Sequence, residues 1–473
     1  MLQPTTRLHV SGYRFLVRRM EHALVRGDPR MLDDPLRAQS ISLAAGAVLT
    51  AVAVTVCAVL AMVKPGGDIG DAPIVVVGNT GAVYVSVGDV VHPVFNLTSA
   101  RLIAGMPADP RTIGQRAVDN AHRGPRLGIP GAPEHISTPL AAGESGWTVC
   151  DDARGETLVI AGEIDSSAAK LGPGVLVRSR EGGAGATFLL YDGRRARVDL
   201  RHPAVTRALR LDGAAPQLIS TTVLSAIPEA PQIAPPHIPE AGSHGPGPLR
   251  EYPVGSVLKV RQANAGPDDA EDLFVVLPDG VQRIGEVTAD LIRYTDSRVG
   301  EQIPTVPPDL IGALPVLDTL PVGTFPDRHG LEQVAVVCAR WKAPPDGDDS
   351  ATTILVGDAW PVISRPVALA QADGDGPAVD AVSVPAGRSA FARSVGLTGG
   401  AQSAGSMFLV TDAGVRYGIR DREAAASLGL PDPAQPAPWP VLSALPHGPE
   451  LSRKDASVPR DGLVALPHTS HPR

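Results

Sequence analysis

A run of 23 residues without a charged side chain, from Ile41 to Val63, constrains this chain more than any other stretch. An α-helix rises about 1.5 Å per residue, so a helix of this length crosses a hydrocarbon core roughly 30 Å thick. Its most polar members, Ser42, Thr50 and Thr55, can bond back to the helix backbone. The alternative is a cleaved signal peptide, but the run exceeds the usual apolar core of such a peptide and 40 residues precede it. We therefore predict a transmembrane helix over residues 41–63.

The charges on either side of the apolar run orient it in the membrane. Residues 1–40 contain seven arginines and four acids. The first charges after the run are Lys64, Asp68 and Asp71, and the next base is Arg101. Because basic residues are retained on the cytoplasmic side, we predict a cytoplasmic N-terminus and an exported part that comprises everything after Lys64.

The exported part is acidic and rich in turn-forming residues. The whole chain has a formal net charge of −8, and since residues 1–40 carry +3, the remainder carries −11. This charge argues against nucleic acid as a partner, because phosphate contacts require clustered Lys and Arg. The 47 prolines and 50 glycines favour short strands joined by turns over long helices.

Two of the three cysteines lie in the exported part. Cys57 falls inside the apolar run, whereas Cys150 and Cys338 lie beyond it, where the medium permits oxidation. Their surroundings mirror each other, since Trp147 stands three residues before Cys150 and Trp341 three residues after Cys338. We expect a disulfide that ties two distant segments into one core and stabilises it by roughly 4–5 kcal/mol in the chain-entropy model. The alternative is a pair of unpaired buried thiols.

The segment before the membrane run predicts an amphipathic helix. Ser11 can cap its start, and Gly27 with Pro29 would end it. Its apolar side chains recur at helical spacing and form one stripe. A lone helix cannot bury such a stripe within itself, so it lies either on lipid or against another protein. We favour a protein partner, and the residues that we assign to this contact are Tyr13, Arg14, Leu16, Val17, Met20 and Leu24.

Four segments of the exported part share one pattern: an apolar strand, an acid-and-glycine turn, a second strand and an Ala/Leu-rich stretch. They cover residues 83–102, 188–209, 273–292 and 407–428. Asp-Gly between apolar runs marks a hairpin, because the turn needs positive φ. Each segment therefore predicts a β-hairpin with a short helix packed on it. The turns recur at unequal intervals of roughly 90 to 130 residues, which argues against a solenoid.

The sequence contains no catalytic motif that we recognise. None of the five lysines follows a glycine, so the Gly-x-x-x-x-Gly-Lys-[Ser/Thr] phosphate loop is absent, and so is a His-Glu-x-x-His zinc motif. Ser403 sits in a sequence like a serine nucleophile elbow, but the first glycine is missing. Acidic clusters at 268–272 and 346–349 do not match a calcium loop. We predict no catalytic residue, no metal ligand and no cofactor.

Several stretches carry a family resemblance in a fixed order along the chain. They are His9–Met20 (HVSGYRFLVRRM), Asp34–Arg37 (DPLR), Val91–Ile103 (VHPVFNLTSARLI), Leu127–Pro133 (LGIPGAP) and Trp147–Cys150 (WTVC). Together with the membrane run they resemble the EccB component of mycobacterial type VII (ESX) secretion systems. The short loops and tail are similar to those of the smaller paralogues, with the ESX-4 type as the candidate.

The resemblance implies a core component of an inner-membrane secretion complex that assembles with EccC, EccD and EccE. It also implies four repeat modules about a disulfide-bonded core, pairing of copies through this periplasmic domain, and a head that packs on the partners. Members of the family are often labelled ATPases. The missing phosphate loop argues against that label here, and EccC is the family motor.

From these observations we expect an α+β chain with one N-terminal transmembrane helix and an elongated periplasmic domain. The expected parts are a cytoplasmic head at 1–40, the transmembrane helix at 41–63, repeat modules at 72–125, 182–248, 249–313 and 396–450, a β-rich core at 126–181 and 314–395, and a disordered tail at 451–473.

The leading functional hypothesis is a non-enzymatic scaffold of a protein-export complex. It follows from the single anchor, the basic amphipathic head and the large exported part without catalytic motifs. Two alternatives stay open at this point: ATP hydrolysis by an unrecognised nucleotide site, and cell-wall binding by the exported domain.

Overall fold

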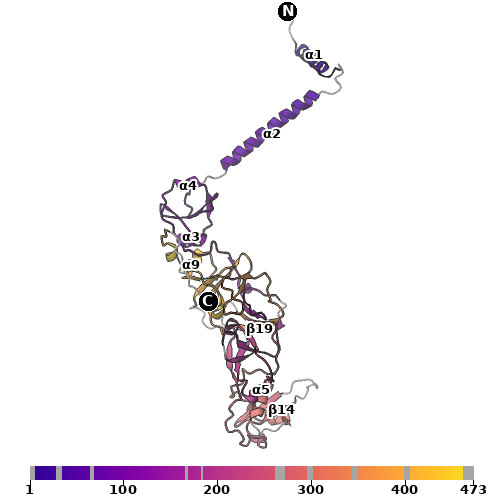
Figure 1. The fold of residues 1–473 in the computed structure, drawn as a ribbon, viewed down its shortest axis with the longest axis vertical. Helices are drawn as coiled ribbons and strands as arrows, with labels where there is room; N and C mark the ends of the chain where they lie inside the picture. Colours follow the sequence, from indigo (N-terminus) through magenta and orange to yellow (C-terminus); the bar gives the residue numbers. More distant parts are fainter. Residues whose placement is uncertain are drawn as a thin grey trace, which may run out of the picture. The chain divides into compact units, whose positions relative to one another are not determined.

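The computed structural model describes residues 6–27, 35–63, 69–165, 169–182, 185–261, 272–295, 302–343, 350–398 and 405–461 (Figure 1). The chain divides into two compact units. The first comprises residues 1–69 and 113–119, and the second comprises residues 70–112 and 120–473.

Helix α1 (Arg7–Arg26) is the predicted head helix, but it begins earlier than expected. The residue before its first turn is Thr6, in an extended conformation, so the prediction of Ser11 as the N-cap is wrong. Residues 7–10 contain no glycine or proline to stop the helix, and it therefore runs back to Thr6. The predicted end is confirmed, because Gly27 has φ 69° and its N–H donates to the Ala23 carbonyl at 2.8 Å.

Helix α2 (Pro35–Val63) contains the predicted membrane run and is 29 residues long. The stretch Gln39–Val59 has a mean hydropathy of 2.2 and is long and apolar enough to cross a membrane. None of this stretch is buried by other parts of the protein, as expected for a helix that faces lipid. The predicted back-bonding of its hydroxyls is confirmed: Ser42 donates to Gln39 at 2.9 Å, Thr50 to Gly46 at 2.8 Å and Thr55 to Ala51 at 2.7 Å.

A seven-stranded sheet, the central sheet, brings together segments that are far apart in the sequence. Its strands follow the order β20-β21-β7-β6-β18-β19-β8. Most residues of its middle strands are buried, since one hydrophobic core lies on each face of the sheet. The bounds are β6 (Trp147–Asp152), β7 (Thr157–Ala161), β8 (Ala169–Lys170), β18 (Val336–Lys342), β19 (Ala351–Gly357), β20 (Val367–Ala368) and β21 (Ala381–Ser383), with the 3-10 turn η1 (Ala142–Glu144) before β6.

The first hairpin pairs β2 with β3 across a turn at Gly88 and Asp89, and Gly88 adopts φ 58°. Helix α3 follows at once, because the Asn96 side chain accepts the Ser99 N–H at 2.8 Å and so caps the first turn. Strand β1 pairs with β2 on the other side. The bounds are β1 (Ile74–Val77), β2 (Val83–Val87), β3 (Val90–Pro93), α3 (Leu97–Ala104), β4 (Arg111–Ile113) and α4 (Gln115–Asp119).

The second hairpin has the turn that the sequence predicts. Asp192 and Gly193 both adopt positive φ, at 44° and 74°, as a two-residue turn between paired strands requires. The sheet order is β12-β9-β10-β11-β13, so it includes β9, which lies in the segment expected as core. The bounds are β9 (Val175–Ser179), β10 (Thr187–Tyr191), β11 (Arg194–Val198), α5 (Pro203–Ala208), β12 (Gln217–Ile219), α6 (Thr221–Ser225) and β13 (Glu229–Ile233).

The third hairpin uses its glycine differently. Gly280 is the first residue of β16 and pairs with Leu277, so the turn residues are Pro278 and Asp279. Glycine is needed here because a Cβ would overlap the Pro315 carbonyl oxygen. The sheet order is β16-β15-β14-β17. The bounds are η2 (Gly247–Leu249), β14 (Val257–Val260), β15 (Asp272–Leu277), β16 (Gly280–Ile284), α7 (Glu286–Thr295), β17 (Thr305–Val306) and α8 (Pro308–Gly312).

The fourth hairpin pairs β23 with β24 across a turn in which Gly414 has φ 79°. The sheet order is β24-β23-β22-β25, with β5 pairing on β22, which lies in the segment expected as core. The Asp421 side chain caps the following helix by accepting the Ala424 N–H at 2.8 Å. The bounds are β5 (Thr138–Pro139), β22 (Arg388–Val395), β23 (Met407–Val410), β24 (Arg416–Ile419), α9 (Arg422–Ser427), β25 (Gln435–Pro438) and α10 (Trp439–Ala444).

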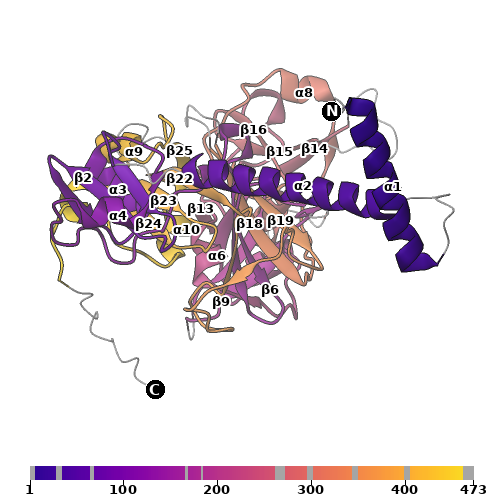
Figure 2. The same cartoon turned by 90° about the horizontal axis from the view of Figure 1, so that it is seen from above.

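The hairpin-bearing sheets share hydrophobic cores with one another and with the central sheet. The first and fourth sheets share one core, where α3 and α9 lie side by side (Figures 1 and 2). The second and third share another, through α5 and α7. The central sheet packs against the second and fourth sheets through a third core, which includes Trp147, Val337, Leu190, Ile219, Val410 and Leu442.

The expectation of a disordered tail from residue 451 is wrong for its first part. Leu451 is fully buried and its N–H donates to the Gly418 carbonyl at 2.7 Å. Helix α11 (Arg453–Ala456) follows, with the Ser452 hydroxyl accepting the Asp455 N–H at 3.0 Å. Leu451 and Ala456 join the core of the first and fourth sheets, and these two apolar contacts order an otherwise polar segment. Residues 462–473 lie outside the described residues.

Substitution of Gly193 tests the contact between the second hairpin and the central sheet. At Gly193 a Cβ would overlap the Thr352 carbonyl oxygen of β19, whereas at Gly213, which has nearly the same φ, it would meet nothing within 4 Å. We expect Gly213→Ala to cost about 1–2 kcal/mol for backbone strain alone. Gly193→Ala should cost about 1–3 kcal/mol more for the overlap. Thermal unfolding of the full chain in detergent measures both, and equal losses would contradict the close contact.

Candidate functional site

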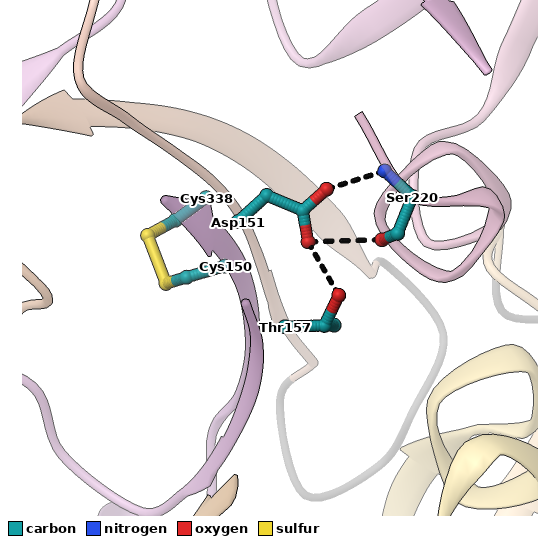
Figure 3. The surroundings of a disulfide bond; sticks show 5 residues. All are labelled: Cys150, Asp151, Thr157, Ser220 and Cys338. Atoms are coloured by element: carbon teal, nitrogen blue, oxygen red, sulfur yellow. Dashed lines mark hydrogen bonds between the residues drawn. A yellow bond between two sulfur atoms is a disulfide. The ribbon is translucent and has the colours of Figure 1, made fainter. Parts of the chain in front are cut away.

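The predicted pairing of Cys150 and Cys338 is confirmed (Figure 3). Cys150 lies on β6 and Cys338 lies directly opposite it on the antiparallel strand β18. Both side chains are buried, in a small cluster that includes Leu158, Ile160 and Leu355. The bond joins residues 188 positions apart in the sequence, so it fixes the pairing of two strands that are remote from each other along the chain.

The same strand pairing explains why the two cysteine segments mirror each other. In the antiparallel register Trp147 lies opposite Trp341, three positions from the Cys150–Cys338 pair. Three is an odd number, so the tryptophans point to the other face of the sheet. There both are buried in the core shared with the second and fourth sheets. The Trp341 indole N–H donates to the Leu397 carbonyl at 2.9 Å.

A buried carboxylate, Asp151, lies next to Cys150 on β6 and is 2% exposed. It accepts hydrogen bonds from the Thr157 hydroxyl and the Ser220 hydroxyl, each at 2.9 Å, and from the Ser220 backbone N–H (Figure 3). Arg180 adds an ion pair at 3.4 Å. Because Ser220 also caps α6, this carboxylate ties the central sheet to the second sheet. Sequence analysis missed it, although an acid directly after the buried Trp147–Cys150 stretch is a signal that could have found it.

Burial dominates the electrostatics of this carboxylate. It raises the pKa of Asp151 above the usual value of 3.8, because the charged form loses its water. The hydrogen bonds from Ser220 and Thr157 and the charge of Arg180 act in the opposite direction and offset only part of the effect. Asp151 is therefore a structural link whose protonation affects folding, and its oxygens are occupied by donors from the protein itself.

A second buried acid, Asp380, binds the first residue of β7, next to Asp151. Asp380 accepts the Thr157 N–H at 2.7 Å through one oxygen. Through the other it accepts the N–H groups of Asp373 and Gly374, at 2.9 and 2.7 Å. Thr157 is thus fixed by Asp151 through its hydroxyl and by Asp380 through its backbone. The arrangement orders the loop before β21 rather than presenting a reactive group.

A cavity of about 790 Å³ opens beside this network. Arg154 and Arg180 contribute positive charge to its wall, but both are paired with acids. Arg154 binds Asp152 at 2.9 Å and Glu156 at 3.0 Å, and Arg180 binds Asp151 and the Gly155 carbonyl. Because these charges are paired within the protein, we interpret the cavity as a gap where the central and second sheets meet and not as a ligand site.

The head residues predicted to bind a partner lie on α1, in the other unit. The stripe is open to solvent, with exposed fractions of 71% for Tyr13, 55% for Leu16, 62% for Met20 and 86% for Leu24. Val17 is half-buried and Arg14 is exposed at its side. The structure thus leaves an apolar surface uncovered on a helix of 20 residues.

The remaining sequence features fall partly outside the described residues. Ser403, the acidic cluster at 346–349 and residues 268–271 of the other cluster lie outside them. Among the residues that the structure does describe, no three His, Cys, Asp or Glu side chains gather as metal ligands.

Comparisons with known proteins point in one direction. The family model described as "Type VII secretion system ESX-1, transport TM domain B" matches residues 2–465. The "ESX-3 secretion system ATPase EccB3" of Mycolicibacterium smegmatis is 38% identical over 485 residues, which are 98% of this chain and 92% of that protein. The "ESX-5 secretion system ATPase EccB5" of Mycobacterium tuberculosis is 33% identical over 488 residues, 97% of this chain and 94% of that protein.

Solved structures match along the same length. A chain of an intact ESX-5 inner membrane complex superposes with a TM-score of 0.71 at 30% identity, covering 100% of this chain and 99% of that one. A chain of the EccB3 dimer from the ESX-3 core complex superposes with a TM-score of 0.69 at 37% identity, covering 82% of this chain and 100% of that one.

Removal of the disulfide should destabilise the protein. We expect the Cys150→Ala/Cys338→Ala double variant to lose about 2–5 kcal/mol of stability, because its unfolded chain is no longer cross-linked. Cys57→Ala is the matched control, since Cys57 is a free cysteine on α2, and it should unfold like the wild type. Thermal unfolding in detergent gives the comparison. A double variant as stable as the control would contradict a stabilising bond.

The pH dependence of stability tests Asp151. Its pKa is higher in the folded protein than in the unfolded chain, so protonation favours the folded state. This contribution is complete below the unfolded pKa and is lost as the pH rises through the folded pKa. We therefore expect the wild type to gain stability relative to Asp151→Asn as the pH falls from about 7 to about 4. The unfolding midpoint of the wild type minus that of Asp151→Asn should therefore increase as the pH falls across that range. A constant difference would argue against the raised pKa.

Proposed function

Because this chain belongs to the EccB family of ESX type VII secretion systems, we propose that it is a structural component of an inner-membrane ESX secretion complex. One observation carries the proposal: the chain matches a subunit of the intact ESX-5 inner membrane complex over its entire length. The match therefore includes the head, the apolar helix and the exported sheets together.

In this proposal α2 is the membrane anchor. Its apolar surface is exposed on all sides, and the arginines before it favour a cytoplasmic head. Everything from residue 64 onward then lies in the periplasm. That placement agrees with the Cys150–Cys338 disulfide, since disulfides persist in oxidising compartments.

The head is the docking element for other membrane subunits, of the EccC, EccD and EccE type. Burial of a Leu or Met side chain contributes about 1.5–3 kcal/mol, so covering Tyr13, Leu16, Met20 and Leu24 supplies enough for stable docking. Arg14 lies beside the stripe and can pair with an acid of the partner. A protein groove accounts for a full apolar stripe better than a lipid surface, because the helix is directly tethered to an anchor of its own.

The periplasmic part supports assembly through repeated small modules. Each of the four hairpins is followed in sequence by a helix, namely α3, α5, α7 and α9, and we propose that these are copies of one module about the central sheet. A relative, EccB3, forms a dimer in a solved structure. We propose that copies of this chain also pair, through the periplasmic part.

The proposal assigns no ATP hydrolysis to this chain. The printed names of the relatives include the word ATPase, but none of the five lysines here stands in a phosphate loop. Energy for transport then comes from a separate motor subunit, and this chain holds the assembly together.

Acidic substitutions on the head test the docking role. We expect Leu16→Glu/Met20→Glu to reduce co-purification of the other membrane subunits more than tenfold, because two charges would enter an apolar contact. Deletion of residues 1–30 should have the same effect. Ser11→Glu is the control, since Ser11 is exposed and lies on the opposite side of α1 from the stripe. Quantitative mass spectrometry of the purified complex reads out the ratio of subunits. Unchanged recovery with the double variant would refute the assembly role of the head.

A further inference from the structure

An arginine on the fourth sheet packs against two aromatic rings. The Arg416 guanidinium carbon lies 5.1 Å from the ring centroid of Phe408 and 5.1 Å from that of Trp439. The two rings are 5.8 Å apart and tilted by 34°. The three side chains come from β24, β23 and α10, which lie together in Figure 2. Such cation–π contacts hold a guanidinium in one orientation.

Arg416 lacks an acidic partner among the residues that the structure describes. Its Nε atom is buried and has no hydrogen-bond partner there. Burial lowers the pKa of Arg416, because the charged form is partly desolvated. Other arginines of the same sheet differ: Arg420 pairs with Glu450 at 3.3 Å and Arg388 pairs with Glu144 at 2.7 Å. A partly desolvated charge without a counter-charge is energetically unfavourable, so an anion bound next to Arg416 would stabilise it.

A groove of about 450 Å³ lies beside this arginine. Its walls include Phe408, Arg416 and the Arg420–Glu450 pair, and glycines form part of its lining. Trp439, whose ring also packs on Arg416, is 46% exposed. The guanidinium is therefore reachable from solvent and has an apolar surface next to it.

Gly418, within β24, is open on the side of this groove. A Cβ at Gly418 would meet nothing closer than 3.9 Å, and its φ is not positive, so neither close packing nor a turn requires glycine there. A glycine inside a strand often marks a place where another backbone approaches closely. The second wall glycine, Gly448, is different, because a Cβ there would overlap the Tyr417 ring.

We propose that this groove binds an extended acidic peptide segment, with a carboxylate on Arg416 and an apolar neighbour against Trp439. A guanidinium binds a carboxylate through two parallel hydrogen bonds. The groove offers one uncompensated positive charge, since Arg420 is neutralised by Glu450, and one charge matches a carboxylate better than a phosphate. The open backbone at Gly418 gives room for the main chain of a peptide.

Two labelled pentapeptides test the site: acetyl-Ala-Val-Glu-Val-Ala and the same peptide with Gln in place of Glu. Fluorescence anisotropy with the full chain in detergent should show about a tenfold preference for the Glu peptide, as expected for one charge-assisted contact. Arg416→Gln should abolish the preference. Gly418→Ala should weaken binding of both peptides, because the added methyl group takes space in the groove without disturbing the fold.

Arg422→Gln is the matched control, since Arg422 is exposed on α9 beyond the groove, and it should bind like the wild type. Unfolding midpoints verify that each variant is folded. The proposal is overturned if the wild type fails to distinguish the two peptides up to about 1 mM. It is also overturned if the preference survives Arg416→Gln, or if the acidic polysaccharide polygalacturonate binds at Arg416 while the Glu peptide does not.

Discussion

The pairing of β6 with β18 is the interaction on which the exported part depends. It joins two segments 188 residues apart, and the disulfide makes the pairing covalent. Cys150 and Cys338 secure one face of the sheet, while Trp147 and Trp341 fill the core on the other face. The second and fourth sheets pack on that core. Without this strand pair they would have no common surface.

The sequence patterns that carried the most information were those with a direct physical cause. The apolar run, the glycine at the end of α1 and the mirrored tryptophans each reflect a local or pairwise requirement that can be read from a few residues. The turn at Asp192 and Gly193 was predictable for the same reason, because positive φ there is a property of the turn itself.

Features that depend on tertiary contact were not predictable in this way. Gly280 looked like a turn residue, but its role is set by the Pro315 carbonyl, which is 35 residues further along the chain. The order of residues 451–461 depends on Leu451 and Ala456 reaching a core built by other segments. Asp151 was missed because its partner Ser220 is 69 residues away. The site at Arg416 likewise requires Trp439, from a separate element.

The core shared by the first and fourth sheets has a consequence for biogenesis. In this core, Ile74 and Leu102 from the beginning of the exported part pack with Leu409, Leu428 and Leu451 from its end. During translocation across the membrane, the first hairpin emerges long before the residues that cover it. Until those residues arrive, the first sheet is a partly folded intermediate with apolar surface in contact with water. Folding of the first sheet is therefore complete only after translocation of the fourth, and premature termination anywhere before the fourth sheet leaves the apolar side chains of the first sheet uncovered.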